Sequence, residues 1–189
     1  MEKNVKIICF VGMSGSGKTT AAEYVKDKGV PDIYFGGMIY KAMQEAGVEI
    51  TPESQQKFRE EIREKEGKDF VAKRVIEEAH KLIESGQHRL VFDGLYTWSE
   101  YRILKHEFPG EMTMVALTPN KHLRHHRLAH RPNRPFDAKE ANERDWSEIE
   151  NLEKGGPIAI ADYFVQNNGS IEDLHAELDE ILKEIKFFE

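Results

Sequence analysis

The strongest chemical pattern in the chain is the glycine-rich stretch GMSGSGKT at residues 12–19. Its glycines allow backbone turns that a side chain forbids, so successive N–H groups can point at one phosphate group. Lys18 can then reach the outer phosphates of a polyphosphate, and the Thr19 hydroxyl can bind Mg²⁺. The pattern predicts a phosphate-binding loop formed by Gly12, Ser14, Gly15, Ser16, Gly17, Lys18, Thr19 and Thr20.

The loop has two alternative interpretations. One is a chance match in a Gly/Ser-rich turn, but an apolar run precedes the loop and a helical pattern follows it, as a phosphate-binding loop requires. The other is the dinucleotide-binding pattern G-x-G-x-x-G, which needs a glycine where Ser14 stands. The loop therefore favours a nucleoside triphosphate, and we expect ATP as phosphoryl donor with Mg²⁺.

A second candidate site is the segment 112–136, which contains no Asp or Glu although the chain has a net charge of −7 at pH 7. On a helix, Arg124, Arg127 and Arg131 fall within about 60° of one another, and Arg134 lies on the loop that follows. Guanidinium groups placed in advance stabilise the charge that develops on a transferred phosphoryl group. We expect Arg127 and Arg131 to contact the phosphates, with Arg124 and Arg134 beside them.

Other uses of this segment stay open. Its arginines could form a solvated basic face paired with the acidic helix over 137–153, which carries seven Asp/Glu. His122, His126 and His130 have a spacing that permits a metal-binding pair, but no Cys lies nearby. Nucleic acid is an unfavoured partner, because the chain is acidic and offers no aromatic stacking platform.

The composition indicates the class of protein that carries these sites. A chain of 189 residues, 39% hydrophobic and 32% charged, is typical of one globular domain. No apolar run reaches the ~18–20 residues that cross a bilayer, and the first residues lack the apolar core of a signal peptide. The one cysteine, Cys9, cannot form an intramolecular disulfide. We expect a cytoplasmic protein without a membrane partner, and the oligomeric state stays open.

Short apolar runs alternate with longer amphipathic stretches, a pattern typical of a parallel sheet covered by helices on both faces. Strands are predicted at 6–11, 32–35, 90–92, 112–117 and 163–166. Helices are predicted over about 18–28, 38–46, 120–130 and 138–154, and after the capping residues Thr51, Asp69, Thr97 and Ser170.

Beyond the loop, the chain carries VFDG at residues 91–94 and ADYFVQNNG at residues 161–169. With these motifs and the Arg-rich segment, it resembles the nucleoside-monophosphate-kinase-like branch of P-loop kinases, which includes adenylate kinase and dephospho-CoA kinase. It looks most similar to adenylate-kinase-related and dephospho-CoA-kinase-like proteins. The resemblance implies the three-layer α/β/α P-loop NTPase fold with a five-stranded parallel sheet in the order 2-3-1-4-5. It also implies acceptor-covering helices over about 38–85 and a helical lid over about 120–156.

The resemblance implies roles for three residues outside the loop. Asp93, at the end of the third strand, would contact the acceptor or a Mg²⁺-bound water; the alternative is a carboxylate that caps the Gly94 turn. Asn167 and Gly169 match the turn that lies over the adenine in these kinases; the alternative is an ordinary turn before a helix N-cap.

The chain departs from the family pattern at two places. Tyr96 stands where an arginine often binds the acceptor phosphate. In YFGGMIYK at residues 34–41, Gly37 takes the position of an acidic residue and Lys41 stands near that of an arginine, although a lysine could equally be solvated on the helix surface. These departures favour a relative of adenylate kinase with a different acceptor.

The sequence therefore predicts an ATP-dependent small-molecule kinase, a phosphotransferase with a small nucleotide-like acceptor. The acceptor is either a nucleoside monophosphate or a dephospho-CoA-like hydroxyl. Lys18, Asp93, Arg127 and Arg131 are the candidate catalytic residues. Two alternatives stay open: a nucleotide-binding regulatory P-loop protein with little turnover, and a polynucleotide 5′-hydroxyl kinase.

Overall fold

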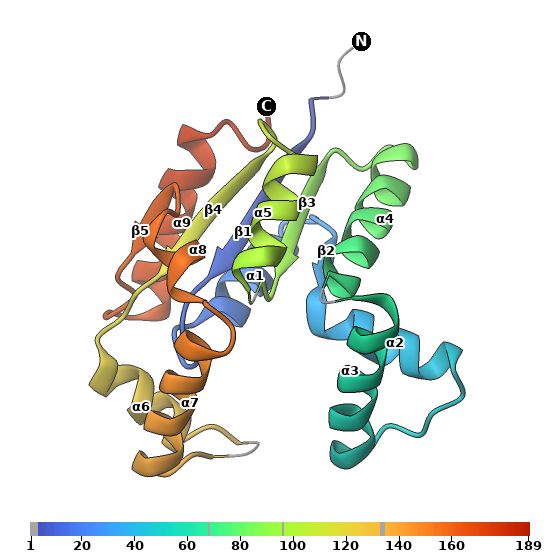
Figure 1. The fold of residues 1–189 in the computed structure, drawn as a ribbon. Coiled ribbons are helices and arrows are strands. Elements are labelled where there is room, and N and C mark those ends of the chain that lie inside the picture. Colours follow the sequence, from blue (N-terminus) through green and yellow to red (C-terminus); the bar gives the residue numbers. More distant parts are fainter. Residues whose placement is uncertain (1–3, 68, 96, 133–134) are drawn as a thin grey trace.

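Five parallel strands form one sheet in the order β2-β3-β1-β4-β5 in the computed structural model, which describes residues 4–67, 69–95, 97–132 and 135–189 (Figure 1). This order confirms the predicted 2-3-1-4-5 topology. The strands are β1 (Lys6–Val11), β2 (Asp32–Tyr34), β3 (Arg89–Asp93), β4 (Met112–Leu117) and β5 (Tyr163–Val165).

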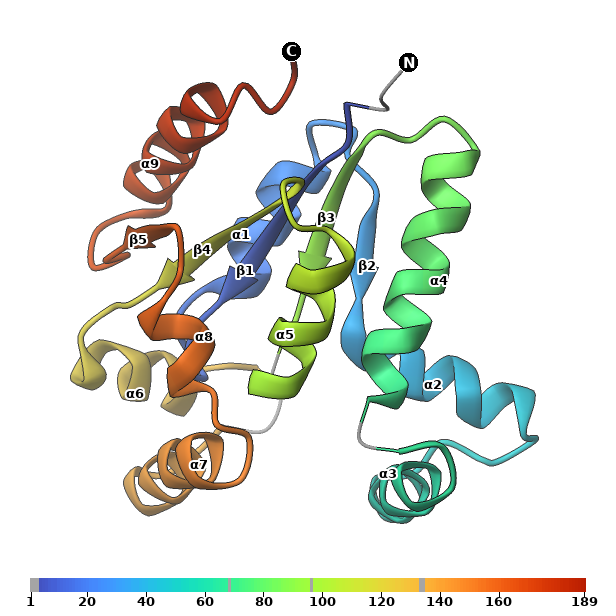
Figure 2. The same ribbon diagram turned by 45° about the horizontal axis from the view of Figure 1, so that its top comes forward.

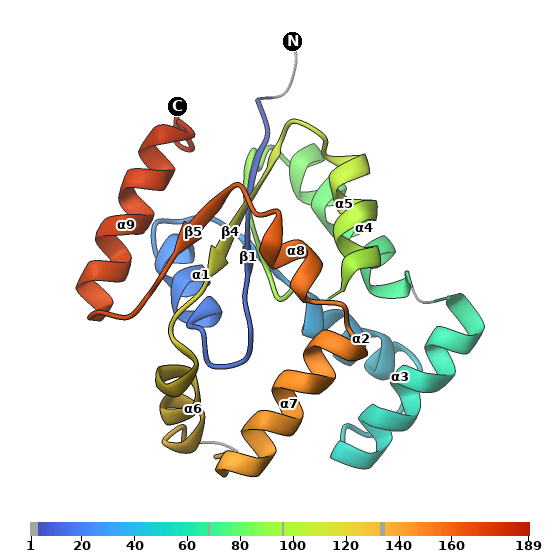
Figure 3. The same ribbon diagram turned by 60° about the vertical axis from the view of Figure 1, so that its left-hand side comes forward.

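Helices lie on both faces of the sheet (Figures 2 and 3). The first four are α1 (Lys18–Lys26), α2 (Phe35–Glu45), α3 (Pro52–Glu66) and α4 (Phe70–Glu84). They are followed by α5 (Trp98–Glu107), α6 (Lys121–Ala129), α7 (Ala138–Glu150), α8 (Gly155–Ala159) and α9 (Ile171–Glu184). No described helix has the length and apolar character needed to cross a membrane.

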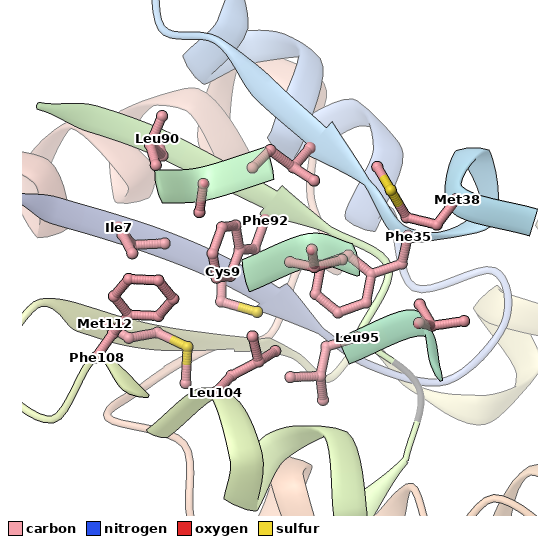
Figure 4. Packing of buried hydrophobic residues seen from close by; sticks show 14 of the residues in the cluster. Ile7, Cys9, Phe35, Met38, Leu90, Phe92, Leu95, Leu104, Phe108 and Met112 are labelled. Atoms are coloured by element: carbon pink, nitrogen blue, oxygen red, sulfur yellow. The ribbon is translucent and has the colours of Figure 1, made fainter. Parts of the chain in front are cut away.

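Successive side chains of the central strand β1 point to opposite sides of the sheet, and helices cover both sides, so β1 is buried on both faces. Ile7 and Cys9 pack with Phe92 of the neighbouring strand β3 and with residues from α2, α4 and α5, among them Leu104 (Figure 4). Phe10, on the other face of β1, packs with residues from α1 and α9. The two clusters are the hydrophobic cores that join the sheet to the helices on its two faces.

Side-chain caps fix several of these helices. Thr97 accepts a hydrogen bond from the backbone N–H of Glu100 in a capping box, and Ser170 does the same with Asp173, so both predicted caps are confirmed. Thr51 Oγ1 accepts from the backbone N–H of Ser54. Asp69, in contrast, makes no side-chain cap, so that prediction was wrong.

Some element boundaries differ from the prediction because tertiary packing overrides local propensity. α2 begins at Phe35, directly after β2, since Phe35 and Met38 are buried against the sheet even though two glycines stand between them. α7 ends at Glu150, and the short helix α8 follows after Glu153, whose φ is 51°.

Two helical pairs lie at the carboxyl end of the sheet, on opposite sides of it (Figures 1 and 2). One pair is α2 and α3, which falls within the acceptor-covering segment predicted at about 38–85. The other is α6 and α7, which falls within the lid predicted at about 120–156. The turn after β1 lies between the two pairs.

Candidate functional site

The phosphate-binding loop connects β1 to α1 at the carboxyl end of the central strand. Gly15 and Gly17 have φ values of 78° and 98°, a left-handed conformation that favours glycine. A Cβ atom at Gly15 would lie 2.7 Å from the carbonyl oxygen of Arg124. Gly17, the N-cap of α1, has no side chain that could bind the first-turn N–H groups of α1. These N–H groups are therefore directed at the region in front of the loop.

Lys18 folds back over this loop. Its Nζ donates to the carbonyl oxygens of Gly12 and Met13, at 2.9 and 3.1 Å. Burial and the nearby Lys154 ammonium lower the pKa of Lys18 to about 7, with Glu148 and Asp93 opposing the shift. Near neutral pH the ammonium is therefore destabilised unless additional negative charge is brought to it.

A cavity of about 450 Å³ lies in front of the loop. The loop and first turn of α1 form one wall, the end of α6 another, and the turn after β5 the third. It brings together the predicted residues Gly15, Gly17, Lys18, Thr19, Thr20, Arg127, Arg131, Asn167 and Gly169. Residues distant in the sequence thus meet around one space large enough for part of a nucleotide.

The arginines of the Arg-rich segment have different surroundings. Arg127 lines the cavity, and its Nη2 donates to the carbonyl oxygen of Asn167 at 2.9 Å; burial lowers the pKa of Arg127. Arg131 lines the cavity from beyond the C-cap of α6, with its guanidinium carbon 4.3 Å from the centre of the Phe136 ring. Arg134 lies outside the described residues.

Arg124 is turned away from the cavity lining and toward α7. Its Nη1 and Nη2 donate to the two carboxylate oxygens of Asp145 at 2.8 and 2.9 Å, and Nη1 also donates to the carbonyl oxygen of Ser14 at 3.0 Å. The side chains of Arg124 and Asp145 are 9% and 10% exposed. Burial alone would raise the pKa of Asp145, but Arg124 and His125 more than offset it and hold that pKa below its usual range. Arg124 therefore pairs with the acidic helix α7, which is one of the alternatives that the sequence left open.

Asp93 and Asn167 approach the loop from the ends of β3 and β5. The Asp93 carboxyl is half-buried, and burial raises its pKa, although Lys18 opposes the shift. Asn167 is buried, with a φ of 41°, and its Nδ2 donates to the carbonyl oxygen of Ser16 at 2.7 Å. Its amide therefore braces the loop directly, a contact that the sequence did not predict.

Three charged residues at the loop were also missed. Glu148 of α7 is fully buried and accepts hydrogen bonds from the backbone N–H and hydroxyl of Ser14. Arg144 and Lys154 contact the same carboxylate. In the sequence, Glu148 is one of seven acidic residues over 137–153, and no periodicity distinguishes the inward-facing one. Only the docking of α7 against the loop identifies it.

A second cavity, of about 300 Å³, lies between α2 and α7. Tyr34, Tyr40 and Phe35 line it on one side, and Arg144 lines it on the other. Lys41, on the exposed surface of α2, does not line it; its Nζ lies 3.3 Å from Oε2 of Glu78 in α4. Lys41 therefore has the position on the helix surface that the sequence analysis gave as the alternative to acceptor binding. Tyr96 lies outside the described residues.

The histidines of α6 take separate roles. His125 Nε2 lies 2.9 Å from Asp145 Oδ2, while the rings of His126 and His130 stack 4.2 Å apart. Within the described ranges, no three His, Cys, Asp or Glu side chains gather closely enough to hold a metal ion.

The chain is similar in sequence to one family model and to proteins of one family. A family model described as an AAA domain matches residues 8–153. A UPF0200 protein of Thermococcus kodakarensis is 30% identical over 182 residues, which are 95% of this chain and 97% of that protein. A UPF0200 protein of Sulfurisphaera tokodaii is 33% identical over 187 residues, which are 96% and 98% of the two chains.

Solved structures share the fold. TT1252 from Thermus thermophilus has a TM-score of 0.68 at 17% identity and covers 95% of this chain and 97% of its own. A shikimate kinase from Acinetobacter baumannii, in complex with shikimate, has a TM-score of 0.57 at 21% identity, covering 97% and 96%. A gluconokinase from Sinorhizobium meliloti has a TM-score of 0.55 at 17% identity, covering 99% and 98%. The likeness is one of fold, and the fold is the three-layer P-loop NTPase fold with a five-stranded parallel sheet.

Proposed function

The chain belongs to the AAA domain family and to the UPF0200 family, and on that premise we propose that it is a kinase that transfers the γ-phosphoryl group of ATP to a small nucleotide-like acceptor. One observation carries the proposal: a single cavity brings the P-loop together with Arg127, Arg131 and the turn after β5. Phosphoryl transfer depends mainly on positioning and on stabilisation of charge, and these are the groups that supply both.

The donor triphosphate would lie along the loop. The N–H groups around Gly15 and Gly17 would hold its phosphates, and Lys18 would turn from its carbonyl partners toward the outer ones. Arg127 and Arg131 face this path from the other wall of the cavity. Their positive charge is in place before the reaction, so no reorganisation is needed as charge develops. Asn167 and Gly169 would cover the adenine.

The oxygen donors at the loop suit a hard divalent cation. Thr19 lines the cavity at the first turn of α1, and Asp93 ends the neighbouring strand β3; hydroxyl and carboxylate oxygens are ligands of the kind that Mg²⁺ takes, directly or through water. When bound, Mg²⁺ supplies charge neutralisation at the phosphates. The Asp93 carboxylate could also accept a hydrogen bond from an acceptor hydroxyl, which orients that hydroxyl for attack.

The acceptor would enter the second cavity, between α2 and α7. Its aromatic wall of Tyr34 and Tyr40 suits a flat ring, and Arg144 supplies a positive charge at the opposite wall. These groups fit a nucleotide-like molecule, either a nucleoside monophosphate or a dephospho-CoA-like hydroxyl. We assign the segment 38–85 to covering this acceptor and the segment 120–156 to a lid that excludes water during transfer.

The test is a screen for acceptor-dependent ADP formation from ATP and Mg²⁺. The panel holds nucleoside monophosphates, dephospho-CoA, shikimate, gluconate and a 5′-hydroxyl oligonucleotide, with Lys18→Ala as the inactive control. We expect one small nucleotide-like compound to raise the rate well above the control. Stimulation by the oligonucleotide alone would identify a polynucleotide kinase. Tight nucleotide binding with no effective acceptor would identify a regulatory module instead.

Once an acceptor is known, Arg127→Ala and Arg131→Ala separate charge stabilisation from simple anion binding. We expect each to lower kcat by about 10²-fold or more while the affinity for ATP changes far less. Arg102→Ala, an exposed arginine of α5 away from the loop, is the matched control. Equal losses of kcat and affinity would reduce the two arginines to an anion-binding patch.

A further inference from the structure

Glu148 stands in an unusual place for a carboxylate. Its Oε2 accepts from the Ser14 backbone N–H at 2.9 Å, and its Oε1 accepts from the Ser14 hydroxyl at 2.7 Å. The same Oε1 lies 3.0 Å from Lys154 Nζ and 3.1 Å from Arg144 Nε. The Glu148 and Lys154 side chains are 0% and 1% exposed. A lid helix therefore inserts an anion into the phosphate-binding loop, where an N–H group of the loop binds it.

Glu148 lies among basic side chains. Lys18, Arg144 and Lys154 lie in one neighbourhood with the carboxylates Glu148 and Asp93, and the buried Glu100 carboxylate also acts on Lys154. Burial alone would raise the pKa of Glu148, but Lys154 and the Ser14 hydrogen bonds keep that pKa below its usual range. A phosphoryl group can accept the same hydrogen bonds from an N–H group, a hydroxyl and cationic side chains as this carboxylate does.

The position of the cluster indicates which phosphoryl group could replace the carboxylate. The donor cavity is lined by Gly15, Gly17 and Lys18, and its lining does not include Ser14. The acceptor-side cavity is lined by Arg144. Glu148 joins the two, because it contacts Ser14 of the loop and Arg144 together. A phosphoryl group passing from donor to acceptor has to cross this boundary.

We propose that Glu148 occupies the place of the terminal phosphoryl group of a nucleoside triphosphate, which displaces it and takes over Ser14, Arg144 and Lys154. The inference rests on the proposed function, since it assumes that the loop binds ATP. A diphosphate is too short to reach these groups and leaves the carboxylate where it is. Glu148 then competes with the triphosphate but not with the diphosphate, and Arg144 and Lys154 are the residues that bind the third phosphate.

The consequence is a difference in affinity between the two nucleotides. Displacing the Glu148 carboxylate from four donors opposes binding of ATP but not of ADP. Glu148→Gln keeps the shape and removes the charge, so we expect affinity for a non-hydrolysable ATP analogue to rise about tenfold, the effect of about 1.4 kcal/mol. The affinity for ADP should stay within about twofold. Glu143→Gln, on the exposed side of the same helix and paired only with Lys139 in the described contacts, should change neither affinity.

Calorimetric titration of both nucleotides into wild type, Glu148→Gln and Glu143→Gln measures this. If Lys154 without its partner prevents folding, Glu148→Gln/Lys154→Met removes both buried charges and keeps the volume. Affinity of this double variant for ADP should match wild type, and its preference for the triphosphate should fall below that of Glu148→Gln. Hydrogen exchange on unaltered protein adds a second readout: the ATP analogue should change protection of α7 near Glu148, and ADP should not.

Two results overturn the inference. If Glu148→Gln weakens ATP and ADP equally, or leaves both unchanged, the carboxylate only braces the loop. If both nucleotides change the exchange of α7 alike, the terminal phosphate does not displace it. A wild-type protein that binds neither nucleotide would refute the proposed function itself, and the inference with it, so the two failures are distinguishable.

Discussion

The lowered pKa of Lys18 makes nucleotide binding depend on pH in a calculable way. At pH 8, a lysine with a pKa of about 7 is protonated in only about 9% of molecules. Polyphosphate beside the ammonium stabilises the charged form, and we expect the bound pKa to return to the ordinary range near 10.4. Binding at pH 8 should therefore take up about 0.9 proton per nucleotide.

The sign follows from the direction of this shift. Below pH 7, Lys18 is already protonated in both states, and affinity is independent of its titration. Between pH 7 and the bound pKa, affinity should fall by about tenfold for each pH unit. The same lysine affects folding with the opposite sign: the unfolded chain holds the proton more tightly, so protein stability rises with pH across that window.

Isothermal calorimetry of ATP binding in two buffers with different ionisation enthalpies, at pH 8 with excess Mg²⁺, measures the proton uptake. The nucleotide contributes little, since its terminal phosphate has a pKa near 6. Lys18→Arg is the matched control, because a guanidinium keeps its proton throughout, so its uptake should be close to zero. A wild-type uptake as low as that of Lys18→Arg, or an affinity that is flat from pH 7 to 9, refutes the assignment of the buried ammonium to the phosphates.

Two further predictions concern contacts of α7 and of the phosphate-binding loop. Arg124→Met leaves Asp145 buried with His125 as its remaining ion-pair partner among the described residues, so unfolding by urea should show a loss of about 3–5 kcal/mol; Arg127→Met should lose far less, and equal losses would contradict the buried pair. Gly15→Ala must push its Cβ into the carbonyl of Arg124, whereas Gly29→Ala has a similar φ of 87° with nothing within 4 Å. Both should incur the left-handed cost of about 1–2 kcal/mol, and thermal unfolding with nucleotide titration should show a larger stability loss and lost ATP binding at Gly15 alone.

The sheet and the loop could be predicted because short-range patterns determine them. A strand, a glycine-rich turn and a helix follow one another directly from Lys6 to Lys26, and each has its own local signal. The meeting of Arg127, Arg131 and the turn at Asn167 with the loop followed from the resemblance, which supplied the strand order and the lid. Composition alone would not have brought these residues together.

The contacts of Glu148, Arg144 and Lys154 could not be predicted in this way. α7 is polar on most of its surface, so its inward face is decided by what it docks against and not by its own periodicity. Arg124 illustrates the same limit. Helical spacing put it on one face with Arg127, but the position of α7 determines that its guanidinium binds Asp145 and Ser14.

The segregation of charge along the chain has a physical purpose in this arrangement. A net charge of −7 repels a polyphosphate at long range, so affinity has to come from short-range groups that the rest of the surface does not neutralise. The carboxylate-free segment 112–136 contributes Arg127 and Arg131 to the cavity lining, and the acidic helix beside it binds Arg124 in a buried bidentate pair. Glu148, the fully buried carboxylate of the same helix, is held by Ser14, Arg144 and Lys154. The ion pairs that dock α7 therefore also hold two of its acidic side chains, Asp145 and Glu148, outside the lining of the cavity that contains Arg127 and Arg131.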